Sequence, residues 1–242
     1  MSFLERVDQT IRRSVVWRSL FRQPYPRDER SREYAVMNTV FLHLHPVRVR
    51  QPAVKFAYTF CLGGLSFFLF LVLTVTGVYL MFFYVPFEGK AYTDILDGQA
   101  RVPFFLLTRN VHRWGAHLMV FFVFLHMMRV FYHGAYKPPR EFNWVVGVLL
   151  LLMTIGLSFT GYLLPWDQIS YWAITIGLNM ASYTPIINTP IQNLIFGGLE
   201  VGQNTLLRFY VLHIMVLPLV AAILLAVHFW RIRKDGGISG PL

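Results

Sequence analysis

The sequence predicts an all-α membrane protein, a bundle of four transmembrane helices with short helices at the membrane interface. Only 14% of its 242 residues are charged and the mean hydropathy is +0.49, whereas soluble domains usually have about 25% charged residues. Four apolar runs are also long enough, at 1.5 Å per helical residue, to cross a hydrocarbon core of about 30 Å. Lipid is therefore the expected solvent for most of the chain.

Residues 1–55 are expected to form a separate basic segment ahead of a helical domain over residues 56–242. Arginines are frequent in this segment, and Pro24 and Pro26 interrupt any long helix. The stretch from Val7 to Phe21 suits an amphipathic helix on the membrane surface. The net charge of +10 comes largely from basic residues that flank the apolar runs. Membrane topology explains that placement, so the expected partner is membrane lipid and not nucleic acid.

The transmembrane spans and their loops fix an expected orientation. The N-terminal segment, the C-terminal tail, and the loop with Lys137 and Arg140 are the basic parts of the chain. By the positive-inside rule, both termini should lie on the negative (cytoplasmic or stromal) side. The four spans are expected at Tyr58 to Tyr84, Arg113 to Tyr132, Trp144 to Leu164, and Leu206 to Trp230.

The loop from Asp167 to Asn204 is long for a connection in a helical bundle, and loops of this length are usually functional. Its apolar stretches, Tyr171 to Ile176 and Ile191 to Phe196, suit short interfacial helices. Pro165 ends the span that precedes it.

Four histidines within the spans are the main functional signal, because ionisable residues are costly inside a membrane. His112 and His126 are 14 residues apart on the second span, and His213 and His228 are 15 apart on the fourth. Each pair therefore marks two levels about 21 Å apart along its helix, the extra residue on the fourth span being absorbed by a rotation of roughly 60°. Because both helices run in the same direction, His112 should face His213 and His126 should face His228.

Paired neutral imidazoles are the usual axial ligands of a haem iron that transfers electrons, since no coordination site remains for oxygen. The alternative is that the histidines are hydrogen-bonding residues between helices. Four histidines in two matched layers favour haem. Glycines supply a second period of 14 residues. Because glycine has no side chain, these positions leave room for a flat macrocycle at each level. These glycines are Gly63 and Gly77 on the first span, and Gly147 and Gly161 on the third.

Several ordered motifs resemble the cytochrome b6 family, the short, split cytochrome b of cytochrome b6f complexes and related bacterial quinol oxidoreductases. They are RNVHRWG (109–115), KPPREFNW (137–144), GYLLPWDQ (161–168), TLLRFYVLH (205–213) and HFWRIRKDGGISGPL (228–242). The resemblance covers about Phe56 to Leu242. The longer N-terminal segment departs from familiar members.

The resemblance implies two b-type haems, a low-potential one on the positive side between His112 and His213 and a higher-potential one between His126 and His228. It also implies basic residues near the haem propionates, where arginine forms charge-assisted hydrogen bonds. The positions are Arg109, Arg113, Arg140 and Arg208, although each also suits a plain interfacial anchor.

Cys61 lies in the segment CLGG, which resembles the family's segment for a covalent haem. The resemblance implies a third haem bound there through one thioether on the negative side, with Arg233 as its basic neighbour. By itself, a single cysteine near a helix start is usually a small apolar filler.

The same resemblance implies a function. Quinol would be oxidised on the positive side, with one electron passing to a Rieske iron–sulfur protein and the other through the two haems to a quinone on the negative side. Pro165, Trp166 and Asp167 would contribute to the quinol pocket. A Pro-Glu-Trp-Tyr motif is absent, which implies that a subunit IV-like partner supplies it.

A c-type cytochrome or plastocyanin would then accept electrons from a dimeric complex in a bacterial plasma membrane or thylakoid membrane. This chain would be a redox subunit and not an enzyme by itself. Two alternatives stay open from the residues. One is a dihaem anchor of another respiratory dehydrogenase, and the other is a haem-free, histidine-based ion transporter.

Overall fold

The computed structural model describes residues 3–13, 28–37, 50–183, 193–195, 197 and 200–239. The chain divides into two units, residues 1–49 and 50–242. In the first unit, α1 covers Phe3–Arg13 and α3 covers Glu29–Met37. The helix expected from Val7 to Phe21 therefore begins earlier, at Phe3, and its residues 14–21 lie outside the described residues.

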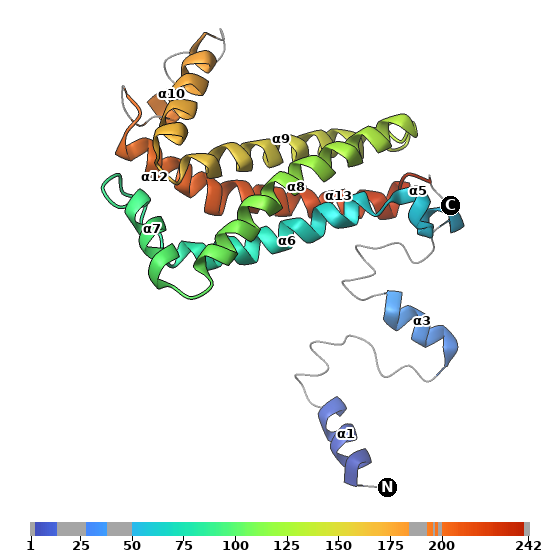
Figure 1. The fold of residues 1–242 in the computed structure, drawn as a ribbon. Coiled ribbons are helices and arrows are strands. Elements are labelled where there is room, and N and C mark those ends of the chain that lie inside the picture. The colour runs from blue at the N-terminus through green and yellow to red at the C-terminus, as the bar shows by residue number, and fades with distance from the viewer. Residues whose placement is uncertain are drawn as a thin grey trace. The chain divides into compact units, whose positions relative to one another are not determined.

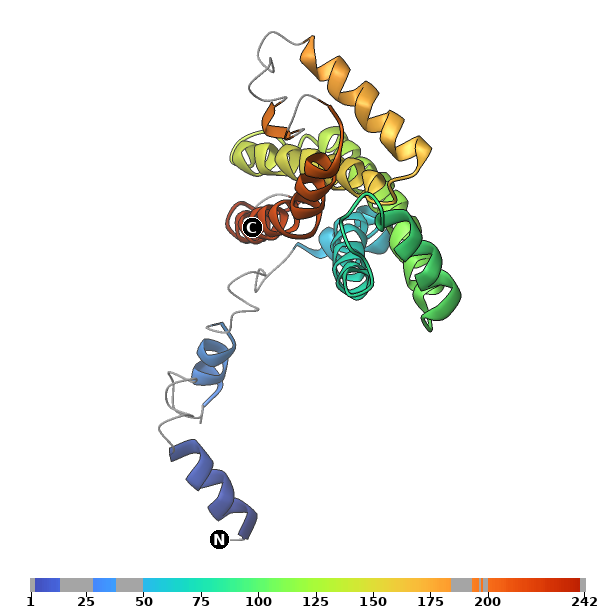
Figure 2. The same cartoon turned by 90° about the vertical axis from the view of Figure 1, so that its left-hand side faces the viewer.

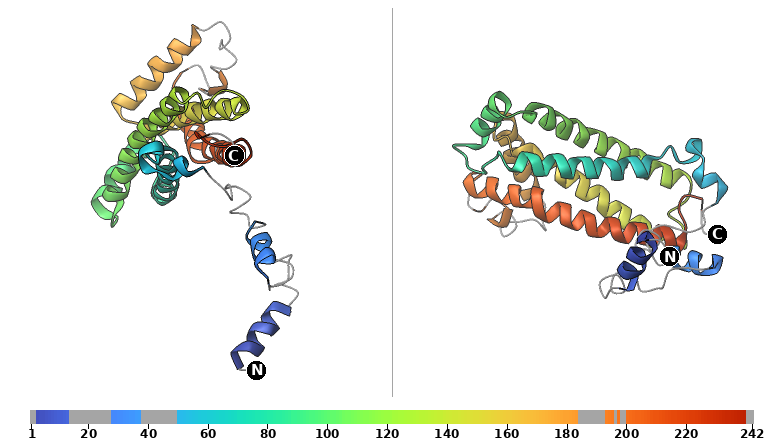
Figure 3. Two further views of the ribbon diagram at one scale, coloured as in Figure 1. Left: turned by 90° about the vertical axis from the view of Figure 1, so that its right-hand side faces the viewer. Right: turned by 90° about the horizontal axis from the view of Figure 1, so that it is seen from below.

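Four long helices make up the second unit, as expected (Figure 1). They are α6 (Leu62–Met81), α8 (Phe105–Tyr132), α9 (Glu141–Leu163), and a last helix in three parts, α12 (Gln203–Val211), η2 (Leu212–Val216) and α13 (Leu217–Asp235). Each is long and apolar enough to cross a membrane. Figure 3 (right) shows them running side by side. The all-α, four-helix prediction is confirmed.

Helix boundaries differ from the expected spans for local reasons. The first span was expected from Tyr58, but Phe60 and Cys61 adopt left-handed backbone conformations, with φ of 48° and 51°. These residues separate the short α5 (Phe56–Thr59) from α6. The second helix begins at Phe105 and not at Arg113. Arg109 and Asn110 interrupt the apolar run, but neither residue breaks a helix.

Short helices lie at the two ends of the long bundle (Figure 1), and Figure 2 looks along the bundle from the end with α7 and α10. At one end, η1 (Gln51–Val54) and α5 precede α6. At the other end lie α7 (Ala91–Arg101), between the first two long helices, and α10 (Gln168–Ser182), which extends the helix expected from Tyr171 to Ile176. A second short helix was expected from Ile191 to Phe196. Residues 193–195 form a helical turn there, and residues 191, 192 and 196 lie outside the described residues.

The four helices pack as two pairs. Helix α6 packs along α8, and α9 packs along α13, while the two histidine-bearing helices, α8 and α13, do not pack closely against each other. The buried apolar cluster of the described residues lies at the α7–α10 end and consists of Leu163, Ile174, Leu178 and Phe209. This cluster fixes α10 against α9 and α12, so the bundle is firmly packed at this end.

Candidate functional site

The four span histidines meet in two facing pairs, as their spacing predicts. The ring centres of His112 and His213 are 6.2 Å apart, and those of His126 and His228 are 6.4 Å apart. Bonds between a metal and an imidazole nitrogen are about 2.0–2.1 Å long, so two imidazoles on opposite sides of one iron have ring centres roughly 6 Å apart. Both pairs therefore have the spacing that a bis-histidine haem requires.

A π-helical turn accounts for the 15-residue spacing on the last helix. It covers Leu212–Val216 and includes His213. Pro218 follows it, and a proline has no N–H to donate and clashes with the carbonyl four residues earlier, here that of Ile214. A wider turn relieves the clash and takes up the extra residue, which brings His213 and His228 to one side of the helix. The expected rotation of roughly 60° assumed a regular helix, and this π-helical turn interrupts that regularity.

Glycines give the imidazoles their space. A Cβ on Gly77 would lie 3.2 Å from Cε1 of His112, one on Gly63 would lie 3.2 Å from Cε1 of His126, and one on Gly161 would lie 2.5 Å from Cε1 of His213. Real Cβ atoms do not reach the last distance without a shift of their neighbours. The glycine helices α6 and α9 thus approach the histidine helices at the ligand positions themselves.

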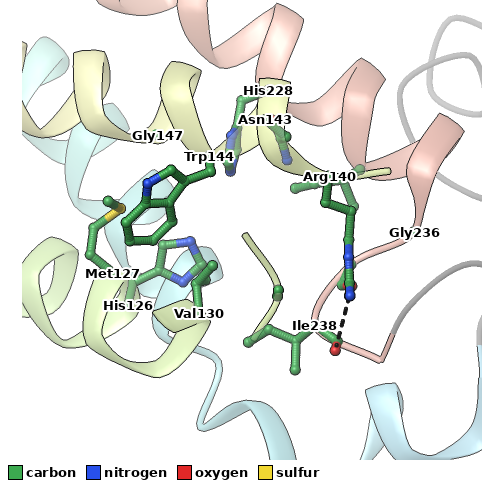
Figure 4. Close-up of a pocket in the computed structure, with 13 residues that line it drawn as sticks. His126, Met127, Val130, Arg140, Asn143, Trp144, Gly147, His228, Gly236 and Ile238 are labelled. Carbon is green, nitrogen blue, oxygen red and sulfur yellow. Dashed lines mark hydrogen bonds between the residues drawn. The ribbon is translucent and has the colours of Figure 1, made fainter. Parts of the chain in front are cut away.

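Gly147 has a different neighbour. A Cβ there would meet Sδ of Met127 at 3.4 Å. Gly147 lines a cavity that also contains both imidazoles of the second level (Figure 4). Sequence reasoning missed Met127, since a methionine on an apolar helix carries no distinguishing signal.

Figure 4 shows His126 and His228 at one end of this cavity and Arg140 at the other. A guanidinium N–H of Arg140 donates to the carbonyl of Gly237 at 2.9 Å, while its Nε has no partner. Oδ1 of Asn143 and Nδ1 of His228 are also buried without hydrogen bonds. Buried polar atoms without partners are costly. A group with an apolar body and a carboxylate edge, such as haem, suits this cavity, because Arg140 would meet the carboxylate.

The other predicted basic residues do not line the cavity that contains Arg140. Arg109 lies within electrostatic range of Arg113 and Asp167 near the start of α8. The Arg208 guanidinium donates to the backbone carbonyls of Asn193 (2.9 Å) and Leu194. Arg208 therefore stabilises the loop before α12 in this structure. Arg113 is exposed, and Arg233 is half-buried near the end of α13.

Cys61 is free and exposed. Its left-handed backbone conformation places it as the N-cap residue of α6. Nearby, the Arg129 guanidinium lies 4.7 Å from the Phe60 ring centre and 5.7 Å from that of Tyr58. The thiol is accessible to a covalent partner, and the aromatic side chains of Tyr58 and Phe60 and the cationic side chain of Arg129 belong to the same part of the structure.

An open hollow lies beside Trp166 and Asp167. Tyr92 from α7 and the first residues of α10, Tyr171 and Trp172 among them, also line this hollow, whereas Pro165 does not. Asp167 acts as a helix cap, because its carboxylate accepts the backbone N–H of Ser170 at 2.8 Å. Trp166 has a left-handed backbone conformation, with φ of 51°. The tight turn after α9 thus exposes an aromatic surface at the end of the bundle.

Comparisons with known proteins agree with this geometry. Residues 48–236 match the family described as Cytochrome b/b6/petB. Cytochrome b6 of Heliomicrobium gestii is 45% identical over 198 residues, which cover 82% of this chain and 91% of that protein. The menaquinol:cytochrome c reductase cytochrome b subunit of Bacillus subtilis (strain 168) is 45% identical over 194 residues, covering 79% and 86%. In a solved hyperthermophilic respiratory Complex III, the similar chain gives a TM-score of 0.69 at 28% identity, covering 88% of this chain and 54% of that one.

Proposed function

Because this chain belongs to the cytochrome b/b6 family, we propose that it carries electrons from a quinol-oxidising site to a quinone site through two haems held by its histidine pairs. Family membership makes it an integral membrane, haem-binding electron-transfer subunit of the quinol:cytochrome c oxidoreductase type. Each haem, when bound, supplies a one-electron iron centre. The chain supplies the ligands and the spacing of the two levels.

The single observation that carries the proposal is the pair of facing histidine levels, with ring centres 6.2 and 6.4 Å apart. His112 and His213 would hold one haem, and His126 and His228 the other. Both histidine helices are backed by helices whose glycines admit the imidazoles. A histidine-based ion transporter needs no such ring spacing at two levels.

The basic loops support an orientation. Arg140 lies beside the second level, and the C-terminal end of α13 carries Arg231, Arg233 and Lys234. By the positive-inside rule, this end would face the negative side, with both termini. The level of His112 and His213 would then lie toward the positive side. The bundle would sit in a bacterial plasma membrane or a thylakoid membrane.

The hollow beside Trp166 and Asp167 supports a quinol site toward the positive side, where an aromatic surface suits a quinol ring. The chain would form this pocket together with a subunit IV-like partner. A Rieske iron–sulfur protein and a c-type cytochrome would take the other electron, in a dimeric complex.

Purification of the native complex tests this function. We expect an α-band of b-type haem, two non-covalent haems per chain, and co-purification of a Rieske protein. Without that absorption band the haem function is wrong. A b-type spectrum with hydrogenase or dehydrogenase subunits, and no Rieske protein, would instead identify a dihaem anchor.

The exposed thiol of Cys61 supports a third haem, bound through one thioether, for which Arg233 would be the basic neighbour. A denaturing gel stained for haem tests it, because only covalent haem stays with the chain. The wild-type band should stain and the Cys61→Ser band should not, while both keep their two non-covalent haems. An unstained wild-type band would exclude the third haem and leave the two-haem function intact.

A further inference from the structure

Two threonine hydroxyls contact the imidazoles of one histidine pair. Oγ1 of Thr76 lies 2.9 Å from Nδ1 of His112, and Oγ1 of Thr160 lies 3.2 Å from Nδ1 of His213. The threonines are on α6 and α9, the helices that back the histidine helices. Each immediately precedes the glycine that abuts the same imidazole. The contacts are thus equivalent on both sides of the pair.

The directions of these hydrogen bonds follow from the neighbouring carbonyls. The Thr76 hydroxyl donates its one proton to the carbonyl of Val72 at 2.7 Å, and the Thr160 hydroxyl donates to the carbonyl of Gly156 at 2.8 Å. Each hydroxyl oxygen therefore faces its histidine as an acceptor. Nδ1 of His213 is also 3.1 Å from the carbonyl of Leu157, which can only accept. Both imidazoles consequently carry their proton on Nδ1 and leave Nε2 free for a metal.

The second histidine pair is built differently. Nδ1 of His228 is buried without a hydrogen-bond partner. The ring of His126 makes no hydrogen bond with any part of the chain that the structure describes, and it packs against Gly63. The residues that precede Gly63 and Gly147 at this level, Leu62 and Val146, are both apolar. The hydroxyl acceptors are therefore specific to one level.

We propose that Thr76 and Thr160 are positioning residues that lower the midpoint potential of the haem held by His112 and His213. An acceptor on Nδ1–H fixes the ring orientation and makes the imidazole a more basic ligand. A more basic axial ligand favours the oxidised iron and so lowers the potential. This inference rests on the proposed haem ligation. It assigns part of the potential difference between the two haems to two hydroxyl groups of this chain.

The direction of the effect matches the orientation proposed above. The level with the hydroxyls would lie toward the positive side, where electrons enter, and the level without them toward the negative side. Electrons then pass from lower to higher potential as they cross the membrane against the electrical field. The two threonines would contribute to that driving force.

Potentiometric titration of the purified complex tests the proposal with Thr76→Val and Thr160→Val. Valine keeps the branched shape and removes the hydroxyl acceptor, whereas the Leu157 carbonyl stays 3.1 Å from Nδ1 of His213. We therefore expect a higher midpoint potential for one haem, with a larger rise in Thr76→Val than in Thr160→Val, the largest rise in the double variant, and no change in the other haem. Thr76→Ser and Thr160→Ser should restore the wild-type potential.

Two other threonines provide matched controls. Thr74 on α6 and Thr154 on α9 also donate to carbonyls four residues earlier, at 2.8 and 2.9 Å, but contact no histidine. Thr74→Val and Thr154→Val should leave both potentials unchanged. If the midpoint potential shifted as much in these controls as in the test variants, the proposal would be overturned. The shift would then come from a general change in helix packing and not from loss of the hydrogen bond to histidine.

Pulsed electron paramagnetic resonance of the wild type provides a test that needs no variant. A hydrogen bond on Nδ1 should lower the quadrupole coupling of the remote imidazole nitrogens of one haem relative to the other. Equal couplings, or unchanged potentials in fully haem-loaded valine variants, would overturn the inference while leaving the two-haem function intact. A wild-type complex without b-type haem would overturn the proposed function itself.

Discussion

At the scale of single residues, the Tyr84 hydroxyl joins two parts of the chain that are 80 positions apart. It donates to the carbonyl of Leu164 at 2.6 Å, directly before Pro165. Its ring stacks on that of Tyr210, with 5.6 Å between the ring centres. Burial raises the pKa of Tyr84, and Tyr210 and Asp94 add to that rise. The phenol is therefore a permanent donor that fixes the turn beside the proposed quinol pocket.

Tyr84→Phe removes this donor and retains the ring. We expect quinol oxidation to slow roughly two- to tenfold, the equivalent of the about 0.5–1.5 kcal/mol that one hydrogen bond contributes. Because the raised pKa keeps the phenol neutral at accessible pH, the ratio of the two rates should not depend on pH. Steady-state assays of the purified complex at several pH values measure this. Tyr162→Phe, at an exposed position, is the control, and an equal loss there would contradict the assignment.

Residue roles at this scale are only partly readable from sequence. The four histidines were predictable, because polar residues at a helical period are rare in apolar spans. Asp167 and Arg208 belong to motifs of the predicted site, yet their side chains cap α10 and bind loop carbonyls. A motif identifies a position, but the hydrogen bonds at that position depend on backbone turns that the sequence does not reveal.

At the scale of helices, glycines set how closely each helix pair approaches. Of the glycines predicted from the period of 14 residues, Gly63, Gly77 and Gly161 lie against imidazoles, whereas Gly147 lies against Met127. The π-helical turn at His213 was not predictable from periodicity, because a 3.6-residue repeat assumes a regular helix. Only the spacing of 15 residues and the nearby Pro218 hinted at it. Periodicity therefore gives the level of each ligand, while local irregularities decide which way the ligand faces.

Alanine substitutions at glycines should reduce haem content in a graded order. Gly161→Ala should lose most of one haem, since its Cβ would lie 2.5 Å from the His213 ring, and Gly63→Ala should lose less, at 3.2 Å from His126. Overpacking of this kind typically costs about 1–3 kcal/mol. Haem content per chain, from pyridine haemochrome spectra, measures the loss.

Neighbouring glycines offer controls for these two variants. A Cβ on Gly64 would meet nothing within 4 Å, and one on Gly156 would meet only a leucine methyl at 3.6 Å. Gly64→Ala and Gly156→Ala should keep both haems. If all four variants lost haem equally, general helix packing would explain the loss and close approach at the ligands would not.

At the scale of the whole bundle, the two helix pairs meet where α8 passes α9 and at a few contacts between the other helices. Phe67 and Phe229 meet edge to face at 5.1 Å, and Tyr84 stacks on Tyr210. The Gln203 side chain also accepts the backbone N–H of Glu88 at 2.9 Å and donates to the carbonyl of Pro86 at 2.8 Å. Between these contacts, the histidine helices α8 and α13 do not pack closely. Ligands that bind both helices should therefore contribute much of the stability of the bundle.

Haem limitation during expression tests this dependence. A ligand that binds only the folded state stabilises it by RT ln(1 + [L]/Kd), about 4 kcal/mol at a thousandfold excess over Kd. We expect haem-depleted protein to unfold at a clearly lower temperature than loaded protein in the same detergent, and added haem to reverse the difference. Size-exclusion chromatography after heating, followed by tryptophan fluorescence, measures it. Identical unfolding temperatures at very different haem contents would mean that the direct contacts between the helix pairs suffice to hold the bundle together.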